Sequence, residues 1–182
     1  MRAVSAVLLA ASFAIAQIQP IKIGARFESI MGVALQNAPA TVVIFVSTEC
    51  PISNDYNERM NALYRDYSGR NVQFLFLNAN NNESAAKIQK HSADNDFAFK
   101  VLKDMGNEWA DKLGATATPE AYVFDRSGTL VYHGYIDDSR NVPTVKVRAL
   151  RDAIDSVLSG KPVARPETRA FGCTIKRVKK SI

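Results

Sequence analysis

The spacing of apolar residues changes abruptly near position 50. Residues 41–47 are mostly β-branched or aromatic, a run too short for a helix and typical of a strand buried on both faces. The apolar residues that follow recur at helical spacing: Ile52, Tyr56, Met60, Leu63, Tyr64 and Tyr67. Pro51 suits the first helical position, where its missing N–H would have no partner, and Ser68-Gly69 ends the pattern. The sequence predicts a buried strand followed closely by an amphipathic helix.

Strands and helices continue to alternate through the rest of the chain. Strands are expected near 30–35 and at 72–77, 97–102, 121–124 and 130–135, and helices at 83–92, 107–113 and 147–158. The turn at 125–128 indicates a hairpin. Trp109 is expected to anchor the core, and Asp137 and Asp138 to lie in a solvated turn. The order β-α-β-α-β-α-β-β-α predicts an α/β fold with a central mixed β-sheet and helices on both faces.

Residues 1–16 differ in character from the remainder. Arg2 precedes an almost wholly apolar stretch, and Ala14-Ile15-Ala16 has the small-x-small form of a cleavage site. The stretch is too short to span a membrane. We therefore expect a signal peptide over 1–16, one domain over 17–160 and a C-terminal tail over 161–182. The mature protein is expected to be exported, periplasmic or extracellular, with no transmembrane segment.

The net charge of +5 is concentrated in the tail. Its basic residues are Lys161, Arg165, Arg169, Lys176, Arg177, Lys179 and Lys180, and its acidic residue is Glu167. We expect a solvated tail, with binding to an acidic partner or a membrane surface as the alternative. Export, and the absence of aromatic residues interleaved with the basic ones, argue against nucleic acid. The sequence leaves the oligomeric state open.

The chain has two cysteines, Cys50 and Cys173. In an oxidising compartment two such thiols can pair, either structurally or catalytically. The two histidines, His91 and His133, are far from each other and from the cysteines in sequence, so no zinc pattern exists and no metal is expected. His91 is expected on the surface of a polar helix, and His133 is expected to face solvent from its strand.

Cys50 is placed where a thiol becomes reactive. It ends the loop after the first buried strand and precedes Pro51 at the start of a helix, where unpaired N–H groups and the helix dipole favour the thiolate. Such positions lower a cysteine pKa from about 8.5 to between about 3.5 and 7.5. The adjacent Glu49 acts in the opposite direction, because a nearby negative charge disfavours the thiolate. A buried, unreactive cysteine is the alternative.

Several motifs carry a family resemblance. They are Glu49-Cys50-Pro51, Gly114-Ala115, Thr118-Pro119-Glu120, residues 125–130, Tyr135-Ile136-Asp137-Asp138 and Gly172-Cys173-Thr174-Ile175-Lys176. Together with the element order, they resemble the thioredoxin-like superfamily and, within it, the exported redoxin (AhpC/TSA-type) proteins. The resemblance implies that Cys50 is the nucleophile and that Pro119 is a cis-proline facing it. It also implies that Thr118 presents its backbone to an extended substrate, and that no bound cofactor is needed.

The chain departs from the usual motifs of these proteins. Ser53 stands where thioredoxins have the second cysteine of CxxC, and Ile44 where they have a buried acid. Asn54 takes the place of the second cysteine of copper-carrying relatives. Peroxiredoxins use PxxxTxxC plus an arginine; here Ser47 fills the threonine position and Val43 replaces the proline. Arg126 falls in the hairpin turn, on the wrong side of the strand to assist peroxide cleavage.

Cys173 has three possible roles. It can resolve a mixed disulfide formed on Cys50, which would restore two-cysteine chemistry without CxxC. It can form a permanent disulfide that staples the tail, worth about 4–5 kcal/mol for so long a loop in the chain-entropy model. It can also be an inert thiol. The first role predicts an exported thiol–disulfide oxidoreductase acting on protein or small-molecule thiols and disulfides. A peroxiredoxin-like thiol peroxidase and a non-catalytic binding module are the alternatives.

Overall fold

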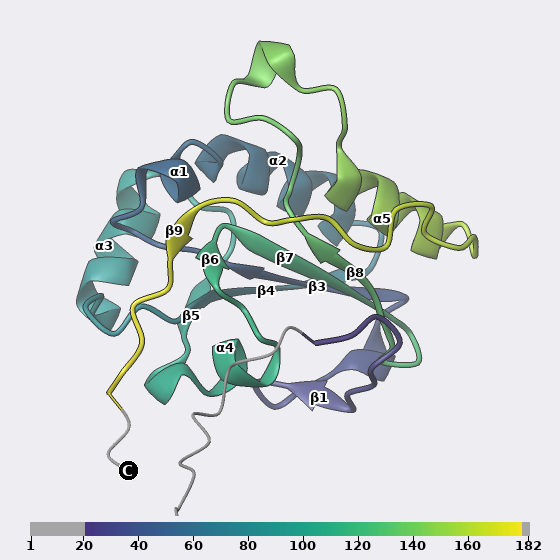
Figure 1. Ribbon diagram of the computed structural model, residues 1–182, viewed down its shortest axis with the longest axis horizontal. Coiled ribbons are helices and arrows are strands. Elements are labelled where there is room, and N and C mark those ends of the chain that lie inside the picture. Colours follow the sequence, from purple (N-terminus) through teal and green to yellow (C-terminus); the bar gives the residue numbers. More distant parts are fainter. Residues whose placement is uncertain (1–20, 180–182) are drawn as a thin grey trace, which may run out of the picture.

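A five-stranded mixed sheet forms the centre of the fold (Figure 1). In this computed structural model residues 21–179 are described, so the expected signal peptide and residues 180–182 lie outside the described part. The strands, in spatial order, are β5 (Val101–Lys103), β4 (Val72–Asn78), β3 (Ala40–Phe45), β7 (Glu120–Asp125) and β8 (Leu130–Gly134). The first three are parallel, whereas β7 is antiparallel to both β3 and β8. The mixed α/β sheet is therefore as predicted.

Helices and shorter strands surround this sheet. The helices are α1 (Pro51–Asn54), α2 (Asn57–Ser68), α3 (Ala85–Asp94), α4 (Glu108–Lys112) and α5 (Ala149–Leu158). Single 3₁₀ turns occur at Leu35–Asn37, Met105–Asn107 and Val142–Thr144. The shorter strands are β1 (Ser29–Ile30), β2 (Val33–Ala34), β6 (Ala117–Thr118) and β9 (Cys173–Thr174). The single strand expected near 30–35 is instead the small antiparallel β1–β2 hairpin.

Strand β3 has a buried core on each of its faces. Val42 and Ile44 pack into the core formed with α2 and α5, whereas Val43 and Phe45 pack into the core on the α4 side, which includes Ala110. Figure 1 shows α2 and α5 above the sheet, and α4 with the β1–β2 hairpin below it. Successive side chains of a strand point to opposite faces, which is why a central strand of this kind is apolar at nearly every position, with Thr41 the exception in β3.

The amphipathic helix predicted after Cys50 is broken into α1 and α2. Tyr56 stands at the break, and its N–H bonds to the Ser53 carbonyl oxygen three residues back instead of continuing the α-helical ladder. Its hydroxyl donates to the Asp137 carboxylate at 3.0 Å, and the side chain is almost completely buried. The spacing of apolar residues does not reveal this break, because Tyr56 remains on the buried face of the helix.

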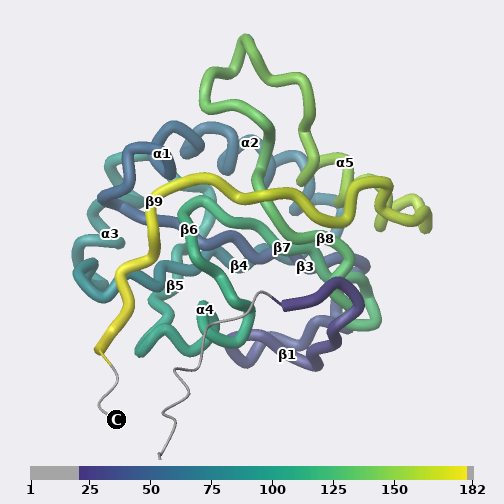
Figure 2. Tube along the Cα trace, viewed as in Figure 1, coloured from purple at the N-terminus to yellow at the C-terminus, as the bar shows by residue number. Residues whose placement is uncertain are grey.

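Residues 161–179, which we call the C-terminal strap, run back across the molecule from the end of α5 (Figure 2). Near its start the strap pairs with the edge of β8: the His133 N–H donates to the Pro166 oxygen, and the Thr168 N–H donates to the His133 oxygen. Near its end β9 pairs with β6, and Ile175 is buried. The expectation of a solvated tail is therefore wrong for this backbone.

The basic side chains of the strap are mostly exposed, as expected. Arg177 is the exception, because it forms an ion pair with Asp111 at 2.9 Å and is half-buried. Within residues 21–179 no helix combines the length and apolar character needed to cross a bilayer.

Three loops meet where the central strands of the sheet end. Phe45 of β3 is in register with Leu77 of the parallel strand β4, so both strands end at the same side of the sheet. Phe45 is also in register with Glu120, with which β7 begins. The segment that contains Cys50, the polar loop after β4 and the Thr118-Pro119 segment therefore meet at a single place.

Candidate functional site

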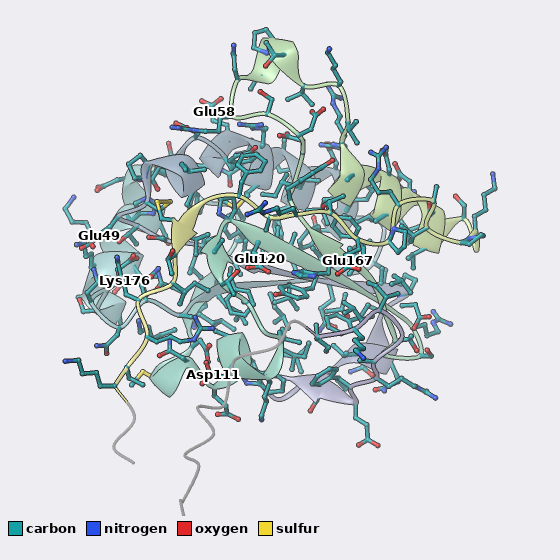
Figure 3. The ribbon with its side chains drawn as sticks, in the orientation of Figure 1. Glu49, Glu58, Asp111, Glu120, Glu167 and Lys176 are labelled. Atoms are coloured by element: carbon teal, nitrogen blue, oxygen red, sulfur yellow. A yellow bond between two sulfur atoms is a disulfide. The ribbon has the colours of Figure 1, made fainter. Side chains whose placement is uncertain are left out.

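Cys50 and Cys173 form a disulfide across 123 residues of sequence, with their Cα atoms 5.8 Å apart. Figure 3 shows this bond between α1 and β9. Cys50 is the N-cap of α1 and is only 3% exposed, and its Sγ accepts a hydrogen bond from the Ser53 N–H at 3.3 Å. Cys173 lies on the strap and is partly exposed. Of the three roles left open for Cys173, the inert free thiol is excluded.

The Thr118-Pro119 segment lies against both cysteines. The peptide bond between these residues is cis, as the family resemblance implied. Strand β6 pairs antiparallel with β9 so that Thr118 is opposite Cys173, and the Thr118 oxygen lies 3.3 Å from the Cys50 Sγ. The approach is close because Gly172 has no side chain: a Cβ there would lie 2.1 Å from the Thr118 oxygen. The structure thus brings together Cys50, Cys173, Thr118 and Pro119, whose catalytic roles remain predictions.

A buried carboxylate holds the loop before Cys50. The Ser47 Oγ accepts hydrogen bonds from the N–H groups of Cys50 at 3.0 Å and Glu49 at 3.2 Å, and donates to Glu83 at 2.5 Å. Glu83 also accepts from the Thr48 N–H and from Asn78, both at 2.6 Å. Burial by itself raises the pKa of Glu83, but these hydrogen bonds outweigh it, so the pKa lies below its ordinary value.

Sequence reasoning missed Glu83. It stands in a polar stretch that predicted only the start of a helix, and the buried acid typical of thioredoxins was sought at Ile44 alone. The position of the thioredoxin acid is indeed apolar, since Ile44 is buried in the core, and the acid near this site comes instead from the loop after β4. The remaining predicted neighbours lie as expected around Cys50: Pro51 opens α1, and the Ser53 Oγ accepts from the Ser47 N–H at 3.1 Å.

A second buried carboxylate, Glu120, follows Pro119 directly. It accepts hydrogen bonds from the N–H groups of Thr116 at 2.7 Å and Ala117 at 2.9 Å, and from His133 Nε2 at 2.6 Å. Burial raises its pKa, but the His133 and backbone hydrogen bonds outweigh burial and hold the pKa below its ordinary value. Glu120 thus fixes the segment that carries Thr118 against the strap. Glu120 is 2% exposed, and Figure 3 shows it beside the sheet, near the middle of the view.

His133 does not face solvent, contrary to expectation. It is 8% exposed and its ring stacks on Tyr122, with 4.6 Å between the ring centroids. The side chains of β8 alternate as expected. However, the strap covers the edge of β8 at His133, and Glu120 gives His133 a hydrogen-bond partner. The strap is far from β8 in sequence, so the pattern of residues in β8 does not reveal that the strap covers this strand.

Two acidic residues near the site are paired. Glu49 is exposed and contacts Lys87 and Asn82, so its charge is partly balanced by a lysine. Asp137 was expected in a solvated turn, and this is wrong: it is buried and accepts two hydrogen bonds from Arg59. The neighbouring Asp138 is partly exposed and accepts from two backbone N–H groups.

The remaining predicted residues lie away from the disulfide or at its margin. His91 is half-buried and contacts the Asn54 side chain at 3.0 Å, and burial lowers its pKa. Trp109 packs against the core on the α4 side, as expected. Arg126 is exposed in the β7–β8 turn, beside the β3 end that begins with Ala40, so it lies at the opposite end of the strand from Cys50, as expected.

Comparison with known families identifies the chain. The AhpC/TSA family matches residues 28–133, which contain the sheet, Cys50, Thr118 and Pro119. The chain belongs to the AhpC/TSA family. No functionally curated protein matches it significantly.

Solved structures agree with this membership. A hypothetical protein from Sinorhizobium meliloti is 28% identical, with a TM-score of 0.79 over 89% of this chain and 98% of that one. An uncharacterized conserved protein from Geobacillus kaustophilus is also 28% identical, with a TM-score of 0.77 over 88% and 94%. A putative thiol:disulfide interchange protein DsbE from Chlorobium tepidum is 16% identical, with a TM-score of 0.55 over 68% and 82%. The last likeness shows the thioredoxin-like fold alone.

The site of this AhpC/TSA family member fits two-electron sulfur chemistry. A disulfide accepts two electrons to give two thiols, and exchange begins when a thiolate attacks one sulfur and displaces the other. The Ser53 N–H and the N-terminal end of α1 favour negative charge on Cys50 when the bond opens. Among the described residues 21–179, no cluster of three or more His, Cys, Asp or Glu side chains is arranged to hold a metal ion.

Proposed function

We propose that this protein is an exported thiol–disulfide oxidoreductase whose redox group is the Cys50–Cys173 pair. The single observation that carries the proposal is the disulfide between a helix N-cap cysteine and a strap strand that pairs with Thr118. Its substrates are protein or small-molecule thiols and disulfides, and a partner thiol supplies the electrons. Export is supported by the expected signal peptide over 1–16 and by a paired cysteine set, which is typical of oxidising compartments.

Each neighbouring residue has a defined part in this proposal. Cys50 supplies the stabilised thiolate, because the Ser53 N–H points at its sulfur from the first turn of α1, which Pro51 opens. Cys173 is the second redox cysteine and takes the place of the missing CxxC cysteine. Thr118 and Pro119 position the segment bound at the sulfurs, and Ser47 holds the loop that carries Cys50.

The peroxidase alternative is favoured by one observation, the AhpC/TSA family match itself. It needs a cation beside the peroxide to stabilise the departing oxygen. Arg126, the arginine nearest in sequence to the expected position, lies at the opposite end of β3 from Cys50. A peroxidase would show peroxide-dependent oxidation of Cys50 to a sulfenic acid in the reduced protein.

The proposal is tested by catalysis of exchange between dithiothreitol and oxidised glutathione, followed by the absorbance of oxidised dithiothreitol. The mature protein is expected to accelerate this exchange, and Cys50→Ser and Cys173→Ser are each expected to lose the acceleration. Ser159→Ala, which alters an exposed serine after α5, serves as the control and should keep the wild-type rate. Equal rates for the wild type and both cysteine variants would contradict the proposal and favour a structural staple. Hydrogen peroxide replaces oxidised glutathione in a parallel assay of the peroxidase alternative.

A further inference from the structure

The two sulfurs of the disulfide differ in access. Cys50 is 3% exposed and lies between α1 and the Thr118 carbonyl, beneath β9. Cys173 belongs to the strap itself and is partly exposed. A thiol in solution therefore meets Cys173 before it can reach Cys50.

The direction of attack sharpens this difference. A thiolate attacks a disulfide in line with the bond, from the side opposite the sulfur that leaves. The Cys50 Sγ contacts the backbone of both Ser53 and Thr118, so protein atoms already crowd the approaches to this sulfur. Cys173 is partly exposed on the strap, so an approach to its sulfur from solvent is less obstructed.

The better leaving group is also Cys50. A thiolate with a lower pKa leaves faster, and a hydrogen bond from the Ser53 N–H at the N-terminal end of α1 stabilises negative charge on the Cys50 sulfur. Access to the sulfurs and the stability of the leaving thiolate thus favour the same polarity: Cys173 is attacked and Cys50 departs.

The strap has further anchors that do not depend on the disulfide. The Ile175 N–H donates to the Thr116 oxygen at 3.0 Å, the Lys176 N–H to Asn80 at 2.8 Å and the Val178 N–H to Asn107 at 2.7 Å. The Arg177–Asp111 ion pair adds to them. These contacts keep β9 over Cys50 after the S–S bond opens, so Cys50 stays shielded and close to Cys173.

We propose that Cys173 is the cysteine that exchanges with partners and that Cys50 is the internal cysteine that closes the disulfide. An external thiolate attacks the Cys173 sulfur, the new S–S bond forms there, and Cys50 leaves as a thiolate. A second external thiolate then attacks the mixed disulfide, which releases the external disulfide and leaves two reduced cysteines. In the opposite direction Cys173 attacks the substrate disulfide and Cys50 resolves it. This inference rests on the proposed function and reverses the roles that the family resemblance implied.

The test compares the two cysteines one at a time, with oxidised glutathione as the probe. In Cys50→Ser the remaining thiol is Cys173, and in Cys173→Ser it is Cys50. We expect glutathione to attach to Cys173 faster than to Cys50 by about tenfold or more at neutral pH, because the strap shields Cys50 and leaves Cys173 partly exposed. In urea, where the strap is released, the difference should disappear, which shows that it comes from the fold.

The oxidised wild-type protein gives the second measurement. It is mixed with reduced glutathione, quenched at short times with N-ethylmaleimide and mapped by mass spectrometry. The proposal predicts glutathione on the Cys173 peptide and the maleimide label on Cys50. Glutathione on Cys50 to an equal or greater extent would overturn the inference and leave the proposed function intact. A disulfide that reacts with glutathione only after unfolding would overturn the proposed function, and the inference with it.

Discussion

Two buried carboxylates, Glu83 and Glu120, hold the backbone on either side of the disulfide. Glu83 accepts from Ser47, whose Oγ in turn accepts from the Cys50 N–H. Glu120 accepts from the N–H groups of Thr116 and Ala117, just before the residue that faces Cys173. In both cases a charged acceptor satisfies donors that would otherwise be buried without a partner. The positions of the sulfurs are therefore set by groups that do no sulfur chemistry themselves.

Replacing Ser47 with alanine tests the first of these supports. The change removes a donor to Glu83 and an acceptor for two backbone N–H groups, and buried polar groups left without partners cost about 1–3 kcal/mol. We expect a loss of unfolding free energy of this size in urea denaturation. Ser159→Ala is the matched control, since that serine is exposed, and it should stay close to the wild type. An unchanged stability for Ser47→Ala would show that the Glu83 network does not hold this loop.

The pH dependence of stability tests the second support. Because the pKa of Glu120 in the folded protein is below its ordinary value of 4.5, its contribution is complete above about pH 4.5. It is then lost as the pH falls through the lower folded-state pKa. Glu120→Gln should lower the stability at pH 7 by about 1–3 kcal/mol and flatten the decline below pH 4.5. Thermal unfolding over a pH series measures both effects.

The control for this series is Glu58→Gln, because Glu58 is exposed in the first turn of α2. It should retain the wild-type decline at acid pH. If Glu120→Gln also retained that decline, the carboxylate would not be a source of the acid sensitivity.

At the scale of elements, the pairing of β9 with β6 depends on Gly172. A Cβ there would lie 2.1 Å from the Thr118 oxygen and 2.6 Å from its carbonyl carbon, so either the strap or the Thr118 segment must move. The backbone atoms on both sides leave no flexible side chain to give way. The one residue before Cys173 therefore determines how closely the strap can approach Cys50.

Gly172→Ala is expected to weaken the disulfide. Overpacking of this kind costs about 1–3 kcal/mol, and the cost is larger in the oxidised state, where the S–S bond prevents the strap from shifting away from Thr118. Titration in glutathione redox buffers should therefore show a disulfide that is reduced more readily than in the wild type. Gly69→Ala is the matched control, since nothing lies within 4 Å of a Cβ there and its φ is −66°. An unshifted midpoint for Gly172→Ala would contradict the role given to this contact.

Elements with a strong local pattern could be predicted from the sequence. The buried strand β3, the hairpin of β7 and β8 and the amphipathic α5 match the expected segments to within two residues at each end, because their apolar spacing reflects their own buried faces. The break at Tyr56 and the pairing of the two-residue strand β9 could not be predicted. The first keeps the helical spacing, and the second depends on a partner far away in sequence.

Only those parts of the site that have a local sequence pattern could be predicted. Cys50 and Pro119 stand in short motifs whose chemistry is local. Glu83, and the burial of His133 and Asp137, arise only from contacts between distant segments. Contacts between distant segments leave no repeating pattern in the sequence, so only the folded structure shows them.

Across the whole molecule, the strap connects the β8 edge of the sheet with the segment that contains Thr118 and with the loops near α4. It pairs with the edge of β8 at His133, crosses the face of the molecule and ends beside α4, where Arg177 meets Asp111 (Figure 2). A disulfide closing a loop of this length would add about 5 kcal/mol in the chain-entropy model if it were the only tie. The other strap contacts mean that the fold has support besides the S–S bond. The protein is therefore expected to stay folded when the S–S bond opens, as disulfide exchange requires.

The most direct test is peptide mapping of the mature protein under non-reducing conditions during a titration with dithiothreitol, with circular dichroism recorded on the same samples. We predict that the linked Cys50–Cys173 peptide disappears at mild reductant concentrations while the folded spectrum persists, and that it returns on reoxidation. A linked peptide that survives until the protein unfolds would contradict the account and make the bond a structural staple.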